Sequence, residues 1–340
     1  MPASPMPLPA RLGKYELVEY LGGGMAHVYR ARDTVLGRVV ALKILTEAGN
    51  KDSETRARFL QEARMASNIQ HDNIINVYDF GEDLGRPFMV MEFLRGESLR
   101  DAIKGGRTGD VQYKLSTALQ IARALDFIHT RKIIHRDIKP ENIHIEVTGK
   151  VKLMDFGIAK AEGLSLTRAG FTLGTPYYMA PEQVLGQTLT NLVDVYAFGI
   201  MMVELFSGQK PITGDTVERI FHQILNSQLN LEPVKQSGAP SAVIKLINRC
   251  TAKNPADRPQ GFSVVCAEIE RIRGGAAPTV ARTAVYSQPQ SQAASSAPGI
   301  FKKLPRKFQS PTWIVTFSAL AVVLFLLIVF LLGKLIASVT

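Results

Sequence analysis

The stretch HRDIKPEN at residues 135–142 decides how this 340-residue chain is interpreted. Eighteen residues after Asp137 the chain reads DFG (155–157), and further on it reads APE (180–182). A single triplet of this kind is common in loops. Three segments in this order and at these spacings are not a chance occurrence, so we look for the chemistry of the protein in and between them.

The residue types in these segments suit the transfer of a phosphoryl group. That reaction needs metal ions on the phosphates, a positioned hydroxyl and neutralised charge. The carboxylate of Asp137 can accept a hydrogen bond from an attacking hydroxyl, while Asn142 and Asp155 supply oxygen ligands that suit Mg²⁺. Lys139, two residues after Asp137, places a cation where it can neutralise the transferring group.

These motifs resemble those of the eukaryotic-type (Hanks-type) protein kinase superfamily, and the fuller strings resemble its membrane-anchored bacterial Ser/Thr branch, over residues 14–272. Lys139 and the string GTPYYMAPE (174–182) follow the family's Ser/Thr pattern rather than its Tyr pattern. The resemblance implies an α+β, bilobal fold, with an N-lobe antiparallel sheet plus one helix and a mainly helical C-lobe. It also implies ATP between the lobes, Mg²⁺ (or Mn²⁺) on its phosphates, and protein Ser or Thr hydroxyls as acceptors.

The string VALK at 40–43 matches the family strand that carries a phosphate-anchoring lysine. Alternation along a strand points Lys43 away from its apolar neighbours and into the cleft. A lone lysine in a strand is usually just solvated, so a partner matters. Glu62 stands where the family places the glutamate of this ion pair, and Glu47 and Glu54 are poorer candidates, because the apolar stripe of the following helix leaves Glu62 beside the cleft.

The glycine-rich segment LGGGMAHV (21–28) fits the family pattern GxGxxGxV least well. Anchoring the pattern on Val28 leaves Gly23 at the second glycine, whereas anchoring it on the outer two glycines moves the valine to Tyr29. The loop is one residue short, which could reduce ATP affinity, and a simple hairpin turn is an alternative. The candidate ATP-binding residues of this segment are Leu21, Gly22, Gly23, Gly24 and Val28.

The segment MVMEFL (89–94) resembles the link between the lobes, where adenine binds. Met91 would limit the back of the pocket, backbone groups of Glu92 and Leu94 would bond the ring, and Ala41 would also contact ATP. Taken alone, the methionines are most simply core filler.

The string AKAEGLSLTRAGFTLGTPYYM (159–179) would be the activation segment. A phosphate on Thr167 or Thr172 could dock on Arg136 and order this segment by charge-assisted hydrogen bonds, which predicts control by autophosphorylation. A loop rich in hydroxyls is also explained by simple solvation. Thr175 is expected to bond Asp137 and Lys139.

Other recognisable residues are expected to have structural roles. Glu182 is predicted to pair with Arg258, and Asp194 to brace the loop around residues 135–136. His71 and His129 are predicted to be packing histidines rather than ligands.

Most of the formal net charge of +10 lies near the C-terminus. Residues 271–340 hold eight Lys or Arg and no Asp or Glu, so the first 270 residues, with 32 basic and 30 acidic side chains, are nearly neutral. We therefore expect no nucleic-acid partner. Cys250 and Cys266 form no CxxC pair, which favours a reducing compartment over a disulfide framework or a zinc site.

A membrane anchor is predicted at residues 311–333. The chain has no charged residue from Trp313 to Leu332, and about twenty helical residues span roughly 30 Å of hydrocarbon; a buried core helix is the alternative. Four cations precede this span and only Lys334 follows it, so the catalytic domain would lie in the cytoplasm, at the plasma membrane, with lipid around a single span.

The remaining segments complete the predicted organisation. They are a flexible N-terminus at 1–13, a kinase domain at 14–272, a disordered basic juxtamembrane linker at 273–310 and a short tail at 334–340. Phosphorylation of Thr279 or Thr283 could recruit a phosphothreonine-binding partner, and the span could support a homodimer, although it lacks GxxxG.

Three functions compete on these residues. An active protein Ser/Thr kinase is favoured, because Lys43, Glu62, Asp137, Asn142 and Asp155 are all present. A membrane-tethered pseudokinase or scaffold is favoured only by the shortened glycine segment. A small-molecule phosphotransferase is disfavoured by Lys139 and by the segment that ends at APE.

Overall fold

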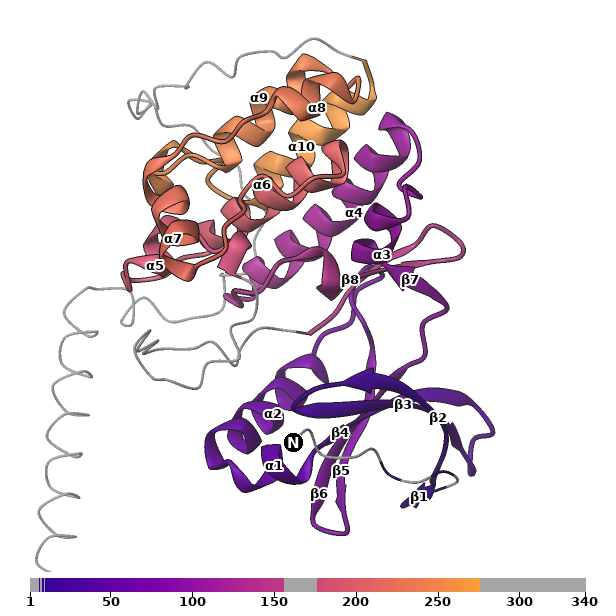
Figure 1. Cartoon of the computed structure of the whole chain (residues 1–340). Coiled ribbons are helices and arrows are strands. Elements are labelled where there is room, and N and C mark those ends of the chain that lie inside the picture. The colour runs from indigo at the N-terminus through magenta and orange to yellow at the C-terminus, as the bar shows by residue number, and fades with distance from the viewer. Residues whose placement is uncertain (1–5, 7, 9, 156–175, 276–340) are drawn as a thin grey trace, which may run out of the picture. The chain divides into compact units, whose positions relative to one another are not determined.

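A computed structural model describes residues 6, 8, 10–155 and 176–275 of the chain. These residues form a bilobal structure, with an N-terminal lobe built on an antiparallel sheet and a mainly helical C-terminal lobe (Figure 1). The α+β, bilobal class predicted from the sequence is confirmed. The predicted span at 311–333 lies outside the described residues, and none of the helices in the described ranges is long and apolar enough to cross a membrane.

The N-terminal lobe contains a six-stranded antiparallel sheet in the order β1-β2-β3-β4-β6-β5. Its strands are β1 (Ala10–Leu12), β2 (Tyr15–Gly23), β3 (Ala26–Asp33), β4 (Val39–Leu45), β5 (Val77–Asp83) and β6 (Arg86–Glu92). Strand β1 begins inside the segment predicted to be a flexible lead-in. It is ordered because it pairs with β2 and because Leu12 is fully buried.

Strand β4 shows the alternation that the sequence predicts around Lys43. Its residues Val40, Leu42 and Ile44 join one apolar cluster of the lobe. Ala41 and Leu45 join a second cluster together with Phe59. Because successive side chains of a strand point to opposite faces, Lys43 lies on the same face as Ala41 and Leu45.

Two helices follow β4, α1 (Glu47–Lys51) and α2 (Ser53–Ala66). Asp52 directly precedes helix α2, and its carboxylate caps the helix by accepting hydrogen bonds from the backbone amides of Glu54 and Thr55. Phe59, Ala63 and Ala66 form its buried stripe. This stripe fixes the rotation of the helix about its axis and so decides where its polar side chains point.

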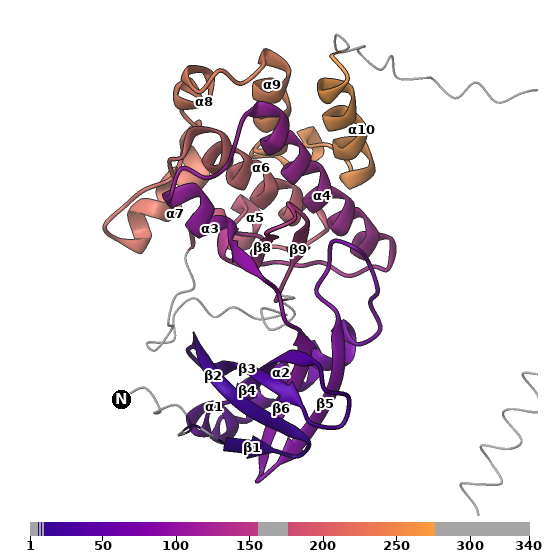
Figure 2. The ribbon, with the colours of Figure 1, turned by 90° about the vertical axis from the view of Figure 1, so that its right-hand side faces the viewer.

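The C-terminal lobe consists of helices around one large apolar core, together with a small sheet in the order β7-β8-β9 (Figure 2). The strands are β7 (Gly96–Ser98), β8 (Ile143–Glu146) and β9 (Val151–Leu153). The helices are α3 (Leu99–Lys104), α4 (Val111–Thr130), α5 (Pro181–Val184), α6 (Leu192–Ser207), α7 (Val217–Asn226), α8 (Glu232–Gln236), α9 (Ser241–Cys250) and α10 (Phe262–Arg273). Helix α6 is buried almost all round, and it packs on α4 and α9.

Candidate active site

A cavity of about 230 Å³ lies between the sheet of the N-terminal lobe and the small sheet of the C-terminal lobe. Its walls are mostly apolar, as expected of a site that encloses a flat organic ring. Seven of the residues predicted to contact ATP line it: Leu21, Val28, Ala41, Lys43, Met91, Glu92 and Leu94. Glu62 and Asp155 line it as well.

The glycine segment forms a tight hairpin between β2 and β3. Val28 lines the cavity, whereas the neighbouring Tyr29 is fully buried in an apolar cluster of the lobe. Of the two alignments left open by the sequence, the structure therefore favours the one anchored on Val28. The three consecutive glycines are described but do not line the cavity. Gly23 has φ of 138°, and a Cβ there would come within 2.0 Å of the carbonyl oxygen of Ala26, so only glycine fits.

Lys43 connects the two lobes through two carboxylates. Its Nζ lies 3.0 Å from Oε1 of Glu62 on α2 and 2.6 Å from Oδ1 of Asp155, which follows β9. The Lys43 side chain is only 16% exposed. The ion pair predicted from the sequence is thus present, and it is joined by the predicted metal ligand.

These contacts shift the pKa of all three groups. Burial alone would lower the pKa of Lys43, but the charges of Asp155 and Glu62 outweigh it and raise that pKa above its ordinary value. The charge of Lys43 lowers the pKa of Asp155 despite burial. For Glu62, burial outweighs the attraction of Lys43 and raises the pKa. At neutral pH the lysine is therefore a fixed cation in the cavity wall.

The predicted catalytic loop brings Asp137, Lys139 and Asn142 together. Nζ of Lys139 lies 2.7 Å from Oδ2 of Asp137. Nδ2 of Asn142 donates to the backbone oxygen and to Oδ2 of Asp137, at 2.8 and 3.0 Å. Because the amide nitrogen of Asn142 faces Asp137, its amide oxygen is left for another partner.

Asp194 on α6 holds the start of this loop. Its two carboxylate oxygens accept hydrogen bonds from the backbone amides of His135 and Arg136, at 2.7 and 2.8 Å, as the sequence predicted. His129 adds a third contact, with Nε2 at 2.8 Å from the same carboxylate. Arg136 has φ of 63°, a conformation that costs about 1–3 kcal/mol for a side-chain-bearing residue and persists only where its surroundings enforce it.

The other predicted structural residues also find their partners. Arg258 binds both carboxylate oxygens of Glu182, at 2.6 and 2.9 Å, and both side chains are buried. His71 packs its ring 4.8 Å from that of Phe127. His71 and His129 each form a hydrogen bond and an aromatic contact, in agreement with the expectation of packing histidines.

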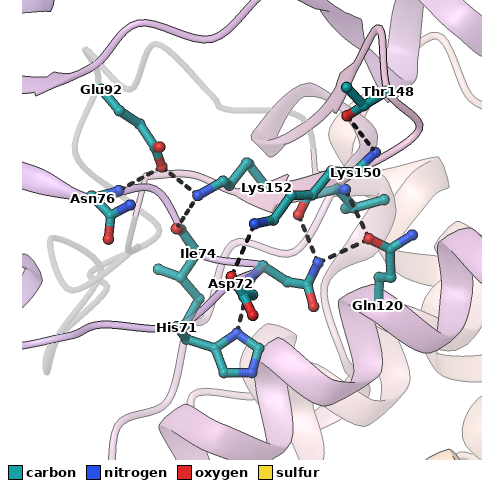
Figure 3. Close-up of polar contacts among 11 residues, drawn as sticks. His71, Asp72, Ile74, Asn76, Glu92, Gln120, Thr148, Lys150 and Lys152 are labelled. Atoms are coloured by element: carbon teal, nitrogen blue, oxygen red, sulfur yellow. Dashed lines mark hydrogen bonds and ion pairs between the residues drawn. The ribbon is translucent and has the colours of Figure 1, made fainter.

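A second polar cluster surrounds the side chain of Glu92, and sequence reasoning did not identify it (Figure 3). Lys152 on β9 donates to Oε1 of Glu92 at 2.6 Å and to the carbonyl oxygen of Ile74 at 3.2 Å. The same carboxylate oxygen of Glu92 accepts a hydrogen bond from the backbone amide of Asn76 at 2.8 Å. These bonds fix the side chain of Glu92, a residue that also lines the cavity.

The backbone of Glu92 is also held in place. Its amide donates to the carbonyl oxygen of Asn76 at 3.0 Å. Because this amide is engaged, a backbone hydrogen bond from Glu92 to a bound base would have to use its carbonyl oxygen.

The predicted metal ligands suit a hard divalent cation that is shared with a nucleotide. Asp155 contributes a carboxylate whose Oδ1 contacts Lys43, and Asn142 contributes an amide oxygen, since its amide nitrogen makes the hydrogen bonds to Asp137. No group of three or more His, Cys, Asp or Glu side chains at metal-binding spacing occurs in the described ranges. A site with one or two protein oxygens fits Mg²⁺, which keeps several waters and binds substrate phosphates.

Several predicted residues cannot be placed. The proposed phosphosites Thr167 and Thr172, and Thr175, lie in the range 156–175, outside the described residues.

Seven lining residues were missed by sequence reasoning: Ala66, Ile75, Val77, Met89, Phe93, His144 and Met154. Met89 and Phe93 belong to the segment expected to bind adenine, Met154 is adjacent to a predicted metal ligand, and His144 comes two residues after the other one, so these four positions carried a signal. The other three depend on how strands and helices pack, which short motifs do not encode.

Comparison with known proteins agrees with this geometry. The profile of the protein kinase domain matches residues 15–268. The chain is 37% identical over 260 residues to the Serine/threonine-protein kinase PrkC of Bacillus subtilis, covering 76% of this chain and 40% of that protein. It is 34% identical over 301 residues to the Serine/threonine-protein kinase PknB of Mycobacterium tuberculosis, covering 86% of this chain and 48% of that protein.

A solved structure is similar as well. The PknI kinase domain of Mycobacterium tuberculosis superposes with a TM-score of 0.63 at 25% identity, covering 80% of this chain and all of that one. The chain belongs to the protein kinase family. It spans less than half of the length of the two curated relatives named above.

Proposed function

We propose that this chain is a Ser/Thr protein kinase that transfers the γ-phosphate of ATP to protein hydroxyls. The observation that carries the proposal is the convergence of two clusters. Lys43, Glu62 and Asp155 form one of them, and Asp137, Lys139 and Asn142 form the other. Membership of the family implies the use of ATP and a divalent metal ion, and the curated relatives carry the name of serine/threonine kinases.

The geometry suggests how these residues would divide the reaction. Lys43, kept charged by its two carboxylate partners, would hold the nucleotide phosphates against the N-terminal lobe. The carboxylate of Asp137 would accept the hydrogen bond of the acceptor hydroxyl and take its proton as the new P–O bond forms and the bond to ADP breaks. Lys139, held beside Asp137, would neutralise the transferring group.

Mg²⁺ is the metal that we propose for this site, with Mn²⁺ as a substitute. Bound Mg²⁺ would neutralise charge on the phosphate oxygens, with Asp155 and the amide oxygen of Asn142 as its protein ligands. The hydrogen bond from Asn142 to Asp137 would hold the carboxylate of the base at a fixed distance from the amide oxygen of the metal ligand.

The decisive experiment incubates the full chain with Mg²⁺ and ATP labelled in the γ position, beside the Asp137→Asn variant. We expect phosphoserine or phosphothreonine in the wild-type protein, and a rate roughly 10²- to 10⁴-fold lower in the variant, because a positioned general base contributes about that much. Equal labelling of the two proteins would overturn the proposal. No labelling of either, with ATP still bound, would favour a scaffold.

Regulation by autophosphorylation is a further part of the proposal. The backbone of Arg136 is fixed by Asp194, and its guanidinium would offer a charge-assisted partner to a phosphate on Thr167 or Thr172. Replacing both threonines with alanine should lower the activity of protein purified after ATP treatment. The same activity in the double variant and the wild-type chain would contradict this regulation.

We also propose that the segment 311–333 anchors the chain in the plasma membrane, with the kinase domain in the cytoplasm. The uncharged run from Trp313 to Leu332 supports this. Placing two charged residues in that run should release the protein from the membrane fraction. From the sequence we also propose a homodimer and a phosphothreonine-binding partner. Crosslinking of the full chain would test both proposals.

A further inference from the structure

Arg100 lies on α3, and no motif of the sequence singles it out. Its side chain is only 8% exposed, although it carries a fixed positive charge. A guanidinium is rarely buried unless carboxylates or other acceptors surround it. The groups around Arg100 therefore indicate what it does.

The guanidinium of Arg100 joins three separate parts of the C-terminal lobe. Its Nε lies 2.8 Å from Oε1 of Glu141, in the loop 135–142. One terminal nitrogen contacts the carboxylate of Glu204 on α6, and the other donates to the hydroxyl of Tyr178 at 2.5 Å. The hydroxyl of Tyr178 in turn donates to Glu204, so Arg100, Tyr178 and Glu204 form a closed ring of hydrogen bonds.

Tyr178 stays a hydrogen-bond donor in this ring. Burial and the charge of Glu204 raise the pKa of Tyr178 above its ordinary value, although the guanidinium of Arg100 acts in the opposite direction. The hydroxyl is therefore protonated near pH 7, and it donates to Glu204 while it accepts from Arg100.

Two of these partners border the proposed site of phosphoryl transfer. Glu141 directly precedes Asn142, the proposed metal ligand. Tyr178 lines a small cavity together with Asp137, the proposed base. A peptide whose hydroxyl reaches Asp137 therefore lies close to the segment that carries Tyr178, the 3₁₀ turn Pro176–Tyr178. We call this turn the Tyr178 wall.

The base has supports of its own, whereas the Tyr178 wall depends on Arg100. The carboxylate of Asp137 is held by Lys139 and Asn142. Within the described part of the chain, the hydroxyl of Tyr178 bonds only the other members of the ring. Removing Arg100 should therefore leave the base in place and release the wall beside it.

We propose that Arg100 is a positioning residue for the protein substrate, which fixes the Tyr178 wall relative to Asp137 and so places the acceptor hydroxyl within reach of the base. The inference rests on the proposed function, since it takes the protein substrate of that reaction as the ligand. Arg100 acts through Tyr178 and not by contact with the reacting atoms. Misplacing a reacting group by about 1 Å can cost roughly 10²-fold in rate, so the position of the wall has a measurable effect.

The test compares two reactions of the full chain that differ only in the acceptor. The first is phosphorylation of a mixture of random peptides that contain Ser or Thr, measured as kcat/KM. The second is hydrolysis of ATP without peptide, in which water is the acceptor and the Tyr178 wall has no peptide to place. The variants are Arg100→Leu, Arg100→Lys and Tyr178→Phe, and Tyr178→Phe removes only the hydroxyl. Arg123→Leu, which breaks an exposed ion pair with Glu270, is the matched control.

A double variant separates positioning from stability. Arg100→Leu alone leaves the carboxylate of Glu204, which is 3% exposed, without its cation, so this variant should melt at a lower temperature. The double variant Arg100→Leu, Glu204→Leu removes both buried charges and should recover most of the thermal stability, because apolar side chains can replace a buried ion pair. It does not restore the hydrogen bonds to Tyr178.

We expect kcat/KM for the peptides to fall about ten- to hundredfold in Arg100→Leu and in the double variant, while ATP hydrolysis stays close to the wild-type rate. Tyr178→Phe should change in the same direction. Arg100→Lys should keep an intermediate kcat/KM, because an ammonium group preserves the charge but cannot make the bonds of the planar guanidinium. The control should match the wild-type chain.

Three results would overturn the inference. A double variant that melts like the wild type and regains its kcat/KM would show that Arg100 only stabilises the lobe. An equal fall of peptide phosphorylation and ATP hydrolysis in the folded variants would show that Arg100 acts on the base or the nucleotide. A wild-type kcat/KM in Tyr178→Phe, which leaves no buried charge unpaired, would remove the link through Tyr178. The proposed function fails separately, if the wild-type chain binds ATP and phosphorylates neither the peptides nor itself.

Discussion

Lys43 and Lys152 look alike as isolated residues, yet the structure uses them differently. Both lie on strands, and both form an ion pair with a glutamate, at 3.0 and 2.6 Å. Lys43 also binds Asp155 and lines the nucleotide cavity, whereas Lys152, whose side chain is 4% exposed, bonds the carbonyl oxygen of Ile74 and does not line it. A buried lysine with a glutamate partner is thus no sign of catalysis by itself. Its remaining contacts decide its role.

The largest effect is expected at Lys43. Replacing it with methionine should lower kcat by roughly 10²- to 10³-fold, because one preorganised charge at the phosphates is lost. Circular dichroism should show an unchanged fold, since the unbranched apolar side chain of methionine fills most of the space of the lysine side chain. If the Lys43→Met variant keeps the wild-type kcat, Lys43 has no catalytic role that distinguishes it from Lys152.

At Lys152 the expected effect is on stability rather than on chemistry. Lys152→Met leaves the carboxylate of Glu92, which is only 17% exposed, without its cation. This should lower the free energy of unfolding by about 3 kcal/mol in denaturant titrations. The double variant Lys152→Met, Glu92→Leu should recover most of this loss, because it removes the unpaired charge. A larger fall in the kcat of folded Lys152→Met than in that of Lys43→Met would contradict the comparison.

The pH dependence of phosphotransfer tests the ion pair between Lys43 and Glu62, which has no counterpart in the reaction at Lys152. Because burial raises the pKa of Glu62, this carboxyl takes up a proton at a higher pH than an ordinary glutamate, and the ion pair is then lost. Phosphotransfer should therefore fall as pH decreases through that raised pKa. The folded protein binds more protons than the unfolded chain between the ordinary and the raised pKa, so the contribution of Glu62 to stability should decrease as pH rises across this window.

The Glu62→Gln variant is the control for this profile. It cannot titrate at position 62, so its low activity should show no acid limb from this group. Identical acid limbs in the variant and the wild-type chain would assign the titration to another residue.

The smallest expected effect concerns the glycine segment, whose neighbours Leu21 and Val28 line the cavity. Gly23→Ala should lower the free energy of unfolding by about 1–3 kcal/mol and raise KM for ATP, because its φ of 138° and the nearby oxygen of Ala26 leave no room for a Cβ. Gly24→Ala is the matched control, since a Cβ there meets open space. Equal thermal melts of the two variants would show that the hairpin adapts.

The sequence by itself determined the fold class and the reacting groups. HRDIKPEN and VALK are short, and their residues act within one loop or strand, so the roles of Asp137, Asn142 and Lys43 can be proposed without coordinates. Glu62 required only the helical stripe that turns it towards the cleft. Each of these inferences depends on local geometry, which neighbouring residues dictate.

Only the tertiary structure decided the pairings between distant residues. The bonds of Lys152 to Glu92 and of Lys43 to Asp155 join positions 60 and 112 residues apart. The choice of Val28 over Tyr29, and the place of His144 in the cavity wall, depend on which face of a strand packs on the core. The physical reason is that burial and strand pairing depend on the whole fold, whereas a short motif determines only the contacts among its own neighbouring residues.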